Sequence, residues 1–323
     1  MIGKDDMMTE ATNTVLDRRA AQERANTHFR FPRDLLQEVI NYSTGMLGRC
    51  FSSIPTDATP DVGVAHIFLF RQVIELADTI EVMLSRGCVS PIRVVLRSMF
   101  ESTVSLQYQL ESEDDIDRRT LSWVQADIRQ RRRASERIRD FEISDELTEK
   151  MPPEVQDDVL NHIDAMTVAL NKPHMREVVE EYDRVRKQRR KWKQGGAPRW
   201  YSLFEGPRSF ELLAKRFHWS DLYDISYREW SAVLHGQGGV QEIFQSAEGG
   251  STTLKGLRYP IDTIYFMVNL AANFLLQAII IISNEYRPDE ANERNAWYMT
   301  EIKPKLDKLG KMKLTIERET LEW

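Results

Sequence analysis

The segment around residues 90–111 is apolar on almost every side, and no other feature constrains the fold as strongly. Arg93, Arg97 and Glu101 follow one another at four-residue spacing, so in a helix they share one face. Aliphatic and aromatic side chains surround that face. A helix that is apolar nearly all round is buried. Because buried charges must be paired, we expect these residues to meet polar partners inside a helical bundle.

Three other helical segments also carry a narrow polar line within apolar surroundings. The lines are Arg71, Glu75 and Asp78 in residues 63–86, Asp224, Arg228, Ser231 and His235 in 220–235, and Asp262, Asn269, Asn273 and Gln277 in 260–284. We infer that these lines and the first converge on one polar cavity. The alternative is purely structural, since i, i+4 ion pairs and buried amides also serve only to join helices.

Residues 264–282 form an uncharged run of nearly the length that a membrane-spanning helix needs. Asn269, Asn273 and Gln277 recur every four residues, so one face of the helix bears three amides. Lipid would penalise that face, whereas a helical bundle can use it. We therefore expect a core helix and no stable membrane insertion.

Proline and glycine separate the remaining helical patterns, and no segment shows a convincing strand alternation. The expected fold class is all-α, a helical bundle with a polar-lined core and a charged helical insertion. The expected organisation is an N-terminal helical extension (1–60), a main bundle domain (61–285) with the insertion at about 113–199, and a charged C-terminal helix and tail (286–323).

The composition of the chain limits the partners that it can bind and indicates its cellular compartment. The net charge of −6 and pI near 5.7 exclude a nucleic-acid-binding protein that is basic throughout. The basic runs 129–139 and 184–193 nevertheless predict RNA contact, and the alternative is that they are solvated helix faces. Two cysteines and an N-terminus without an apolar signal core predict a cytoplasmic protein. Scattered histidines and isolated cysteines predict neither a metal site nor a cofactor.

The segment 223–236 holds the best candidate for chemistry. His235 lies at the end of the expected helix and precedes Gly236, which can cap it. The negative end of the helix dipole favours the protonated imidazole there. A plain capping role for His235 is the alternative. Tyr227, Ser231 and Arg228 lie on the turns before it.

Two stretches resemble a bacterial family of unknown function, the domain family 5677. One is the arginine–glutamate helix from Ile92 to Glu101, and the other runs from Trp200 and Tyr201 through Tyr227 and Ser231 to His235 and Gly236. The resemblance covers about residues 40–285, with a poor match over 113–195. It implies an all-helical cytosolic protein, implies no activity, and marks five site residues, which are Arg97, Glu101, Tyr227, Ser231 and His235.

A weaker resemblance is to HEPN (higher eukaryotes and prokaryotes nucleotide-binding) ribonucleases, small and often dimeric helical bundles whose active helix has an arginine followed four to six residues later by a histidine. Arg228 and His235 have this spacing. Glu229 departs from the asparagine, aspartate or histidine that commonly follows that arginine. The resemblance implies catalytic roles for Arg228 and His235.

The sequence therefore leads to two hypotheses about a functional site, and to a third in which the chain is a helical interaction scaffold and the polar lines are purely structural. The first is a metal-independent, HEPN-like ribonuclease, a toxin or antiviral effector, in which Arg228 and His235 are catalytic. The second is a non-catalytic helical module that binds a small anionic ligand or a protein partner. The expected binding residues are Arg97, Glu101, Arg93, Tyr227, Ser231 and Asn273. In the second hypothesis the receptor is the cavity of Arg97, Glu101 and His235, and a homodimer is a further expectation.

Overall fold

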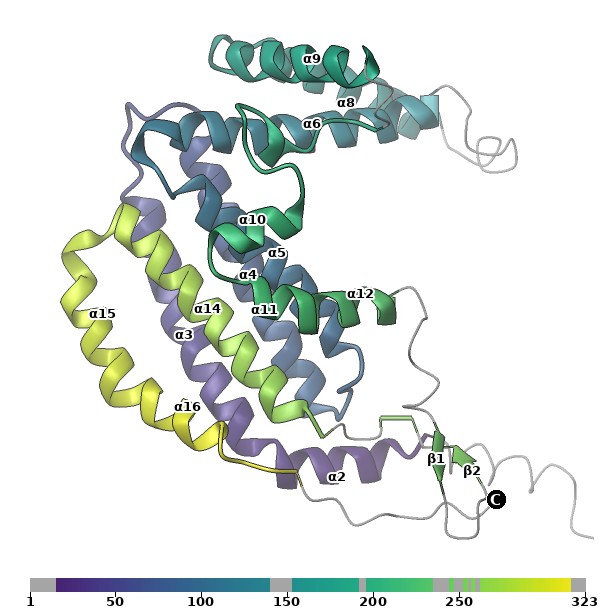
Figure 1. Cartoon of the computed structure of the whole chain (residues 1–323), viewed down its shortest axis with the longest axis vertical. Coiled ribbons are helices and arrows are strands. Elements are labelled where there is room, and N and C mark those ends of the chain that lie inside the picture. Colours follow the sequence, from purple (N-terminus) through teal and green to yellow (C-terminus); the bar gives the residue numbers. More distant parts are fainter. Residues whose placement is uncertain are drawn as a thin grey trace, which may run out of the picture. The chain divides into compact units, whose positions relative to one another are not determined.

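The computed structural model describes residues 16–139, 153–191, 196–234, 244–246, 252–254, 257–258 and 262–314. Almost all of the described chain is helical, which confirms the all-α prediction (Figure 1). A small antiparallel hairpin is the exception: β1 (Phe244–Ser246) pairs with β2 (Thr252–Leu254). The chain divides into two compact units, made of residues 1–53, 67–107 and 219–323, and of residues 54–66 and 108–218.

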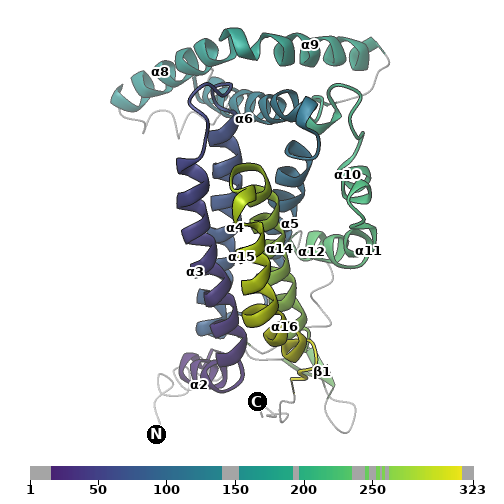
Figure 2. The ribbon, with the colours of Figure 1, turned by 90° about the vertical axis from the view of Figure 1, so that its left-hand side faces the viewer.

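Long helices build the first unit. In chain order its elements, or those that enter it, are α2 (Arg18–His28), α3 (Arg30–Ser52), α4 (Val62–Ser85), α5 (Ile92–Gln109), α11 (Ser220–Leu222), η4 (Tyr223–Tyr227), α12 (Arg228–Leu234), α14 (Ile264–Tyr286), η5 (Pro288–Glu290), α15 (Ala291–Trp297), η6 (Tyr298–Ile302) and α16 (Lys303–Leu309). Helix α14 packs along α3, with α16 against both (Figure 2).

Helix α14 has the length and apolarity of a membrane span, but most of its side chains are covered by other helices. Its buried positions include Phe274, which packs between Phe100 of α5 and Trp219 at ring-centroid distances of 5.6 and 5.9 Å. Burial of large aromatic side chains of this kind is the main contribution to core stability. Within the structure, α14 therefore serves as a core helix.

The second unit is built around helix α6 (Ile116–Arg139). Helices α8 (Pro153–Leu170) and α9 (Arg176–Lys191) pack against it. The remaining elements are η1 (Glu113–Asp115), η2 (Pro173–Met175), η3 (Trp200–Ser202) and α10 (Phe210–Arg216). This unit contains the segment 113–199 that the charge pattern marked as an insertion.

One polar contact lies deep in the second unit. His66 and Thr120 are fully buried, and Nε2 of the imidazole lies 2.8 Å from the threonine Oγ1. Burial lowers the pKa of His66 to about 4, because the protonated ring would lose its hydration there. His66 is therefore neutral in the folded protein at neutral pH.

Helix 220–235 is not a uniform α-helix. Residues Tyr223–Tyr227 form a π-helical turn, in which the Arg228 amide donates to the Tyr223 carbonyl, five residues back. The α-helix resumes at Arg228 and continues to Leu234. A π turn is wider than an α turn, and it changes which side chains face the core.

Candidate functional site

Arg97 is the centre of a polar cluster between α5 and the continuous segment of η4 and α12. Its Nε donates to Glu101 Oε1 at 3.1 Å, Nη1 to the Ser231 hydroxyl at 2.9 Å and Nη2 to the Tyr227 hydroxyl at 3.2 Å. The Tyr227 hydroxyl in turn donates to Glu101 Oε1 at 2.6 Å. These four residues, called the Arg97 cluster below, include four of the five positions that the family resemblance marked.

Burial and mutual pairing set the protonation states of the Arg97 cluster. Burial raises the pKa of Tyr227 strongly, and its hydrogen bond to the Glu101 carboxylate raises it further, whereas Arg97 opposes the change. Burial alone would lower the pKa of Arg97, but its hydrogen bonds to Glu101 and Tyr227 outweigh that effect and raise it. The tyrosine therefore stays protonated and the arginine stays charged across the physiological range.

A column of stacked side chains joins this cluster to the exposed Arg228. The Arg97 guanidinium carbon lies 4.9 Å from the centre of the Tyr227 ring. Tyr227 stacks on Tyr223 with centroids 4.8 Å apart, and the Arg228 guanidinium carbon lies 5.6 Å from the centre of the Tyr223 ring. Cation–π contacts and stacking each favour a fixed geometry. The column thus orients Arg228, which also pairs with Asp224 at 3.2 Å.

Glu229, the departure from the HEPN pattern, has a structural partner. Its Oε1 lies 3.7 Å from Nη1 of Arg93, whose side chain is only 5% exposed. A nearly buried arginine needs a countercharge, and Glu229 supplies one. Arg93 therefore has the polar partner that a buried charge needs, but this partner is 56% exposed and does not belong to the Arg97 cluster.

Two of the four predicted lines do not enter a common cavity. Arg71 and Glu75 pair with each other at 2.7 Å and are 66% and 59% exposed. Asn273 is also exposed and donates to the side chain and carbonyl of Asn269. The line on 220–235 is split, since Ser231 joins Arg97 whereas Asp224 and Arg228 face solvent. His235 lies outside the described residues.

The basic runs have many partners within the chain. In the run 129–139, Arg129 pairs with Asp183 at 3.5 Å and lies over the Tyr182 ring, while Arg133 donates to the Tyr182 hydroxyl at 2.8 Å. In the run 184–193, Arg184 makes two hydrogen bonds to Glu181. These contacts show one structural use for the arginines. RNA contact through these runs stays a prediction.

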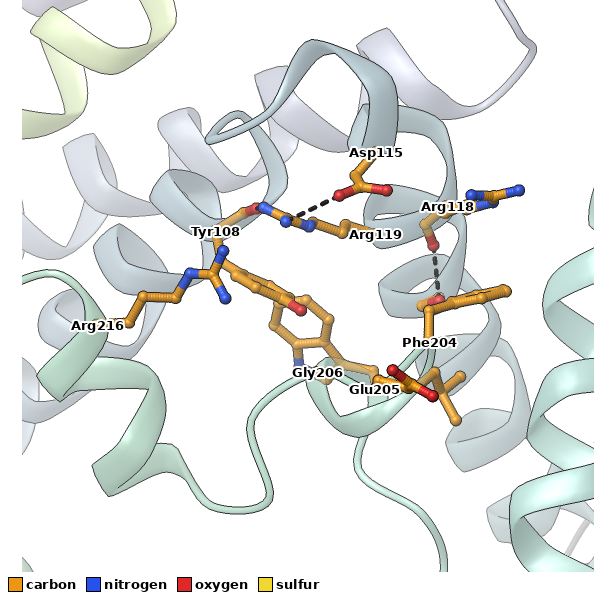
Figure 3. Close-up of a pocket in the computed structure, with 11 residues that line it drawn as sticks. Tyr108, Asp115, Arg118, Arg119, Phe204, Glu205, Gly206 and Arg216 are labelled. Carbon is orange, nitrogen blue, oxygen red and sulfur yellow. Dashed lines mark hydrogen bonds and ion pairs between the residues drawn. The ribbon is translucent and has the colours of Figure 1, made fainter.

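Sequence reasoning did not assign a role to Tyr223, which the structure places in the stacked column. It also missed a pocket in the second unit (Figure 3), lined by Tyr108, Arg119 and residues of the segment 200–206, called the pocket segment below. No signal in the sequence brings residues as far apart as 108 and 200 together. Among the described residues, no group of three or more histidine, cysteine, aspartate or glutamate side chains is placed to hold a metal.

Comparison with known proteins gives one match. The sequence model of a family of unknown function (DUF5677) matches residues 64–250, which include both α5 and α12. This match covers more than half of the chain and confirms the first resemblance. No curated protein matches the chain, and no solved structure does. The likeness to HEPN ribonucleases has no counterpart among these results.

Proposed function

The chain belongs to this family of unknown function (DUF5677), and we propose that it is a metal-independent ribonuclease whose reacting groups lie on and just after α12. The observation that supports the proposal is the stacked column from Arg97 to Arg228. It holds an exposed guanidinium in a defined orientation, as the binding of a phosphodiester requires. Preorganised positive charge is most effective where negative charge develops in the transition state.

In this scheme Arg228 binds the scissile phosphate and His235 transfers protons. The imidazole removes the proton of the ribose 2′-hydroxyl, and the 2′-oxygen attacks phosphorus. The bond to the 5′-oxygen breaks, and the leaving oxygen gains a proton from the imidazolium or from water. The products are a 2′,3′-cyclic phosphate and a free 5′-hydroxyl. The arginine supplies the countercharge that a metal ion would otherwise provide.

The Arg97 cluster acts as a positioning device in this proposal. Arg97 uses Nε, Nη1 and Nη2 on protein acceptors, so its role is to hold Tyr227 and Ser231 and, through them, α12. The expected biological role is that of a toxin or antiviral effector in the cytoplasm. Two free cysteines, one of them buried, support a reducing compartment.

The test is cleavage of single-stranded RNA by the purified full chain at pH 5–8 in the presence of a chelator. His235→Ala and Arg228→Ala are expected to lower the rate at least about 100-fold, the usual range for loss of general acid–base or charge stabilisation. Arg71→Ala is the matched control, because Arg71 is an equally exposed arginine in an i, i+4 ion pair on another helix. A substrate with 2′-deoxyribose at the cleaved position must stay intact.

A second candidate function is the non-catalytic binding of a small anion or a protein partner. The Arg97 cluster favours a non-catalytic role, because Arg97 donates to Glu101, Tyr227 and Ser231 in contacts that join α5 to the segment 223–234. Intact RNA after incubation with the full chain, together with a rise in melting temperature on adding inorganic phosphate, would replace the ribonuclease proposal with this one. Cleavage that survives His235→Ala would remove the proposed chemistry.

A further inference from the structure

Within the described parts of the chain, one side of the core helix α14 is left uncovered. The positions along this side are exposed or half-buried, and they are Phe266, Asn269, Asn273, Gln277 and Ile280. At about 100° per residue these five positions lie within an arc of about 80° that is centred on Asn273. The five residues are called the α14 face below, and none of them is charged.

The α14 face combines apolar surface with amides. Phe266 and Ile280 are 55% and 41% exposed, although most of the same helix is buried in the core. Asn273 Nδ2 donates to the Asn269 side-chain oxygen at 2.6 Å and to the Asn269 carbonyl at 2.8 Å. The Asn273 amide oxygen and the Asn269 amide nitrogen take no part in these bonds. The α14 face therefore offers a partner an apolar surface together with amide donors and acceptors.

The order of residues on the α14 face is complementary to itself. If a second copy of the helix lies antiparallel to the first with Asn273 on the twofold axis, Phe266 meets Ile280 of the second copy, because both lie seven residues from the centre. Asn269 likewise meets Gln277, because both lie four residues from it. Apolar side chains thus meet apolar ones and amides meet amides, as a twofold interface between identical surfaces requires.

The outer face of α4 lacks this self-complementarity. Its exposed positions are also symmetric in spacing, about a point midway between Arg71 and Glu75. An antiparallel second copy would pair these two charges across the axis, but it would also set Phe68 opposite the Asp78 carboxylate. Covering a carboxylate with an aromatic ring removes hydration without supplying a partner. Symmetric spacing alone therefore does not give complementary chemistry, and the α14 face has both.

The chemistry of the α14 face also disfavours other occupants. Lipid would leave three amides in apolar surroundings without new partners. Nucleic acid binds positive charge, and this face has none. A polar residue at the centre of an apolar helix seam, in contrast, fixes the register and the number of helices that associate. Asn273 has this position between Phe266 and Ile280.

We propose that two copies of this chain associate through α14, as an antiparallel helix pair with Asn273 on the twofold axis. The sequence led to the expectation of a homodimer without a surface for it, and this proposal supplies the surface. From Phe266 to Ile280 the seam is about 21 Å long at 1.5 Å per residue. This is a small interface, so we expect a dissociation constant on the order of micromolar. The proposal does not depend on the ribonuclease chemistry.

Sedimentation equilibrium of the full chain between about 1 and 100 μM tests the proposal. We expect the mass to rise with concentration from 37.7 kDa toward twice that value. Ile280→Glu sets a carboxylate against Phe266 at both ends of the seam and is expected to weaken the dimer at least about tenfold. Val82→Glu is the matched control, because Val82 is 51% exposed on α4 and gains the same charge. It should leave the dimer unchanged.

Two double variants test the antiparallel register. Asn269→Lys combined with Gln277→Glu places opposite charges across the axis, so the dimer is expected to persist with at least wild-type affinity. Asn269→Lys combined with Gln277→Lys places like charges there and is expected to weaken it at least about tenfold. Positions 269 and 277 are about 12 Å apart along one helix, so the charges do not neutralise each other within a single copy.

Three results would overturn the proposal. The first is a monomer at every concentration. If that monomer also floats with phosphatidylcholine vesicles, the α14 face binds lipid instead. The second is an equal loss of dimer in Ile280→Glu and Val82→Glu, and the third is equal affinity of the two double variants. Circular dichroism checks the folding of each variant. If Ile280→Glu does not fold, the double variants still decide, because they change only amide positions on the uncovered side of the helix.

Discussion

Each of the two units holds an arginine that contacts a tyrosine ring and pairs with a glutamate, but the two arrangements have different surroundings. In the first, Arg97 lies 4.9 Å from the centre of the Tyr227 ring and pairs with Glu101. In the second, Arg119 lies 4.4 Å from the centre of the Tyr108 ring and pairs with Glu111. The partner of the tyrosine hydroxyl differs. Tyr227 donates to the same carboxylate that holds its arginine, whereas Tyr108 donates to a backbone carbonyl at 3.4 Å.

This difference separates a closed polar cluster from the wall of a pocket. Around Arg97 the donors and acceptors satisfy one another, and the cluster joins two helices. Around Arg119 the polar groups are divided among several elements, and a space remains. Both units hold fully buried polar side chains with atoms that have no hydrogen-bond partner among the described residues, Thr103 in the first and Gln109 and Gln125 in the second. Incomplete polar pairing of this kind costs stability.

The largest expected effect tests how tightly the pocket segment is built. Gly206→Ala forces a methyl group against the Tyr201 carbonyl oxygen and the Tyr108 hydroxyl, so we expect a loss of about 3 kcal/mol in the free energy of unfolding. Gly48→Ala in α3 is the control, since nothing lies within 4 Å of the added methyl group. It should gain about 0.5–1 kcal/mol. Equal effects in urea unfolding would show that the pocket segment is not constrained.

The next effect concerns the buried His66 of the second unit. The unfolded chain gains a proton near pH 6.5 and the folded one only near pH 4, so stability is full above pH 6.5 and falls as the pH drops toward 4. Between pH 7.5 and 4.5 the expected loss from this residue is about 2.5 kcal/mol. His66→Gln should remove that part of the pH dependence. An unchanged slope in the variant, measured by urea unfolding, would contradict it.

A third prediction compares two arginine–glutamate pairs of equal spacing. Arg97→Met removes three hydrogen bonds within a partly buried cluster and should cost about 2 kcal/mol. Arg71→Met breaks a mostly exposed pair and should cost less than about 0.5 kcal/mol. Thermal unfolding of both variants measures the difference. Similar losses would mean that the Arg97 cluster is no stronger than a surface pair.

The smallest effect compares the two tyrosine hydroxyls directly. Tyr227→Phe removes a 2.6 Å hydrogen bond to a carboxylate, and we expect a loss of about 1.5 kcal/mol. Tyr108→Phe removes a long contact of 3.4 Å to a carbonyl, with an expected loss below about 0.5 kcal/mol. A reversal of this order in chemical denaturation would refute the distinction between closed cluster and pocket wall.

The helices were predictable because their signals are local. The apolar wrapping of residues 90–111 and the amide-bearing run 264–282 identified α5 and α14 as core helices, and the expected start at residue 90 lies two residues before Ile92, where α5 begins. The π turn at 223–227 was missed, since no local pattern distinguishes it from an α turn. The hairpin was missed because three-residue strands are too short to alternate recognisably.

Which polar lines meet could not be read from spacing alone. Arg71–Glu75 and Arg97–Glu101 have the same i, i+4 pattern, but only the second faces another helix. The neighbouring residues distinguish the two pairs only in part. Helix α5 is apolar nearly all round, whereas in α4 the exposed Val64, Phe68 and Val82 share the outer face. Because exposed apolar residues give the same sequence pattern as buried ones, the expectation that the Arg71 line enters a common cavity was wrong.

The wide turn in the helix before α12 has a consequence for how this chain tolerates change in length. A π turn contains one more residue than an α turn, so this helix has the length of a regular helix with one amino acid inserted. Ile225, inside that turn, is 72% exposed. Removing it should let the backbone tighten into a regular α-helix while Ser231 and Tyr227 keep their phase relative to α5, so a one-residue deletion here would be milder than the same deletion anywhere in α12.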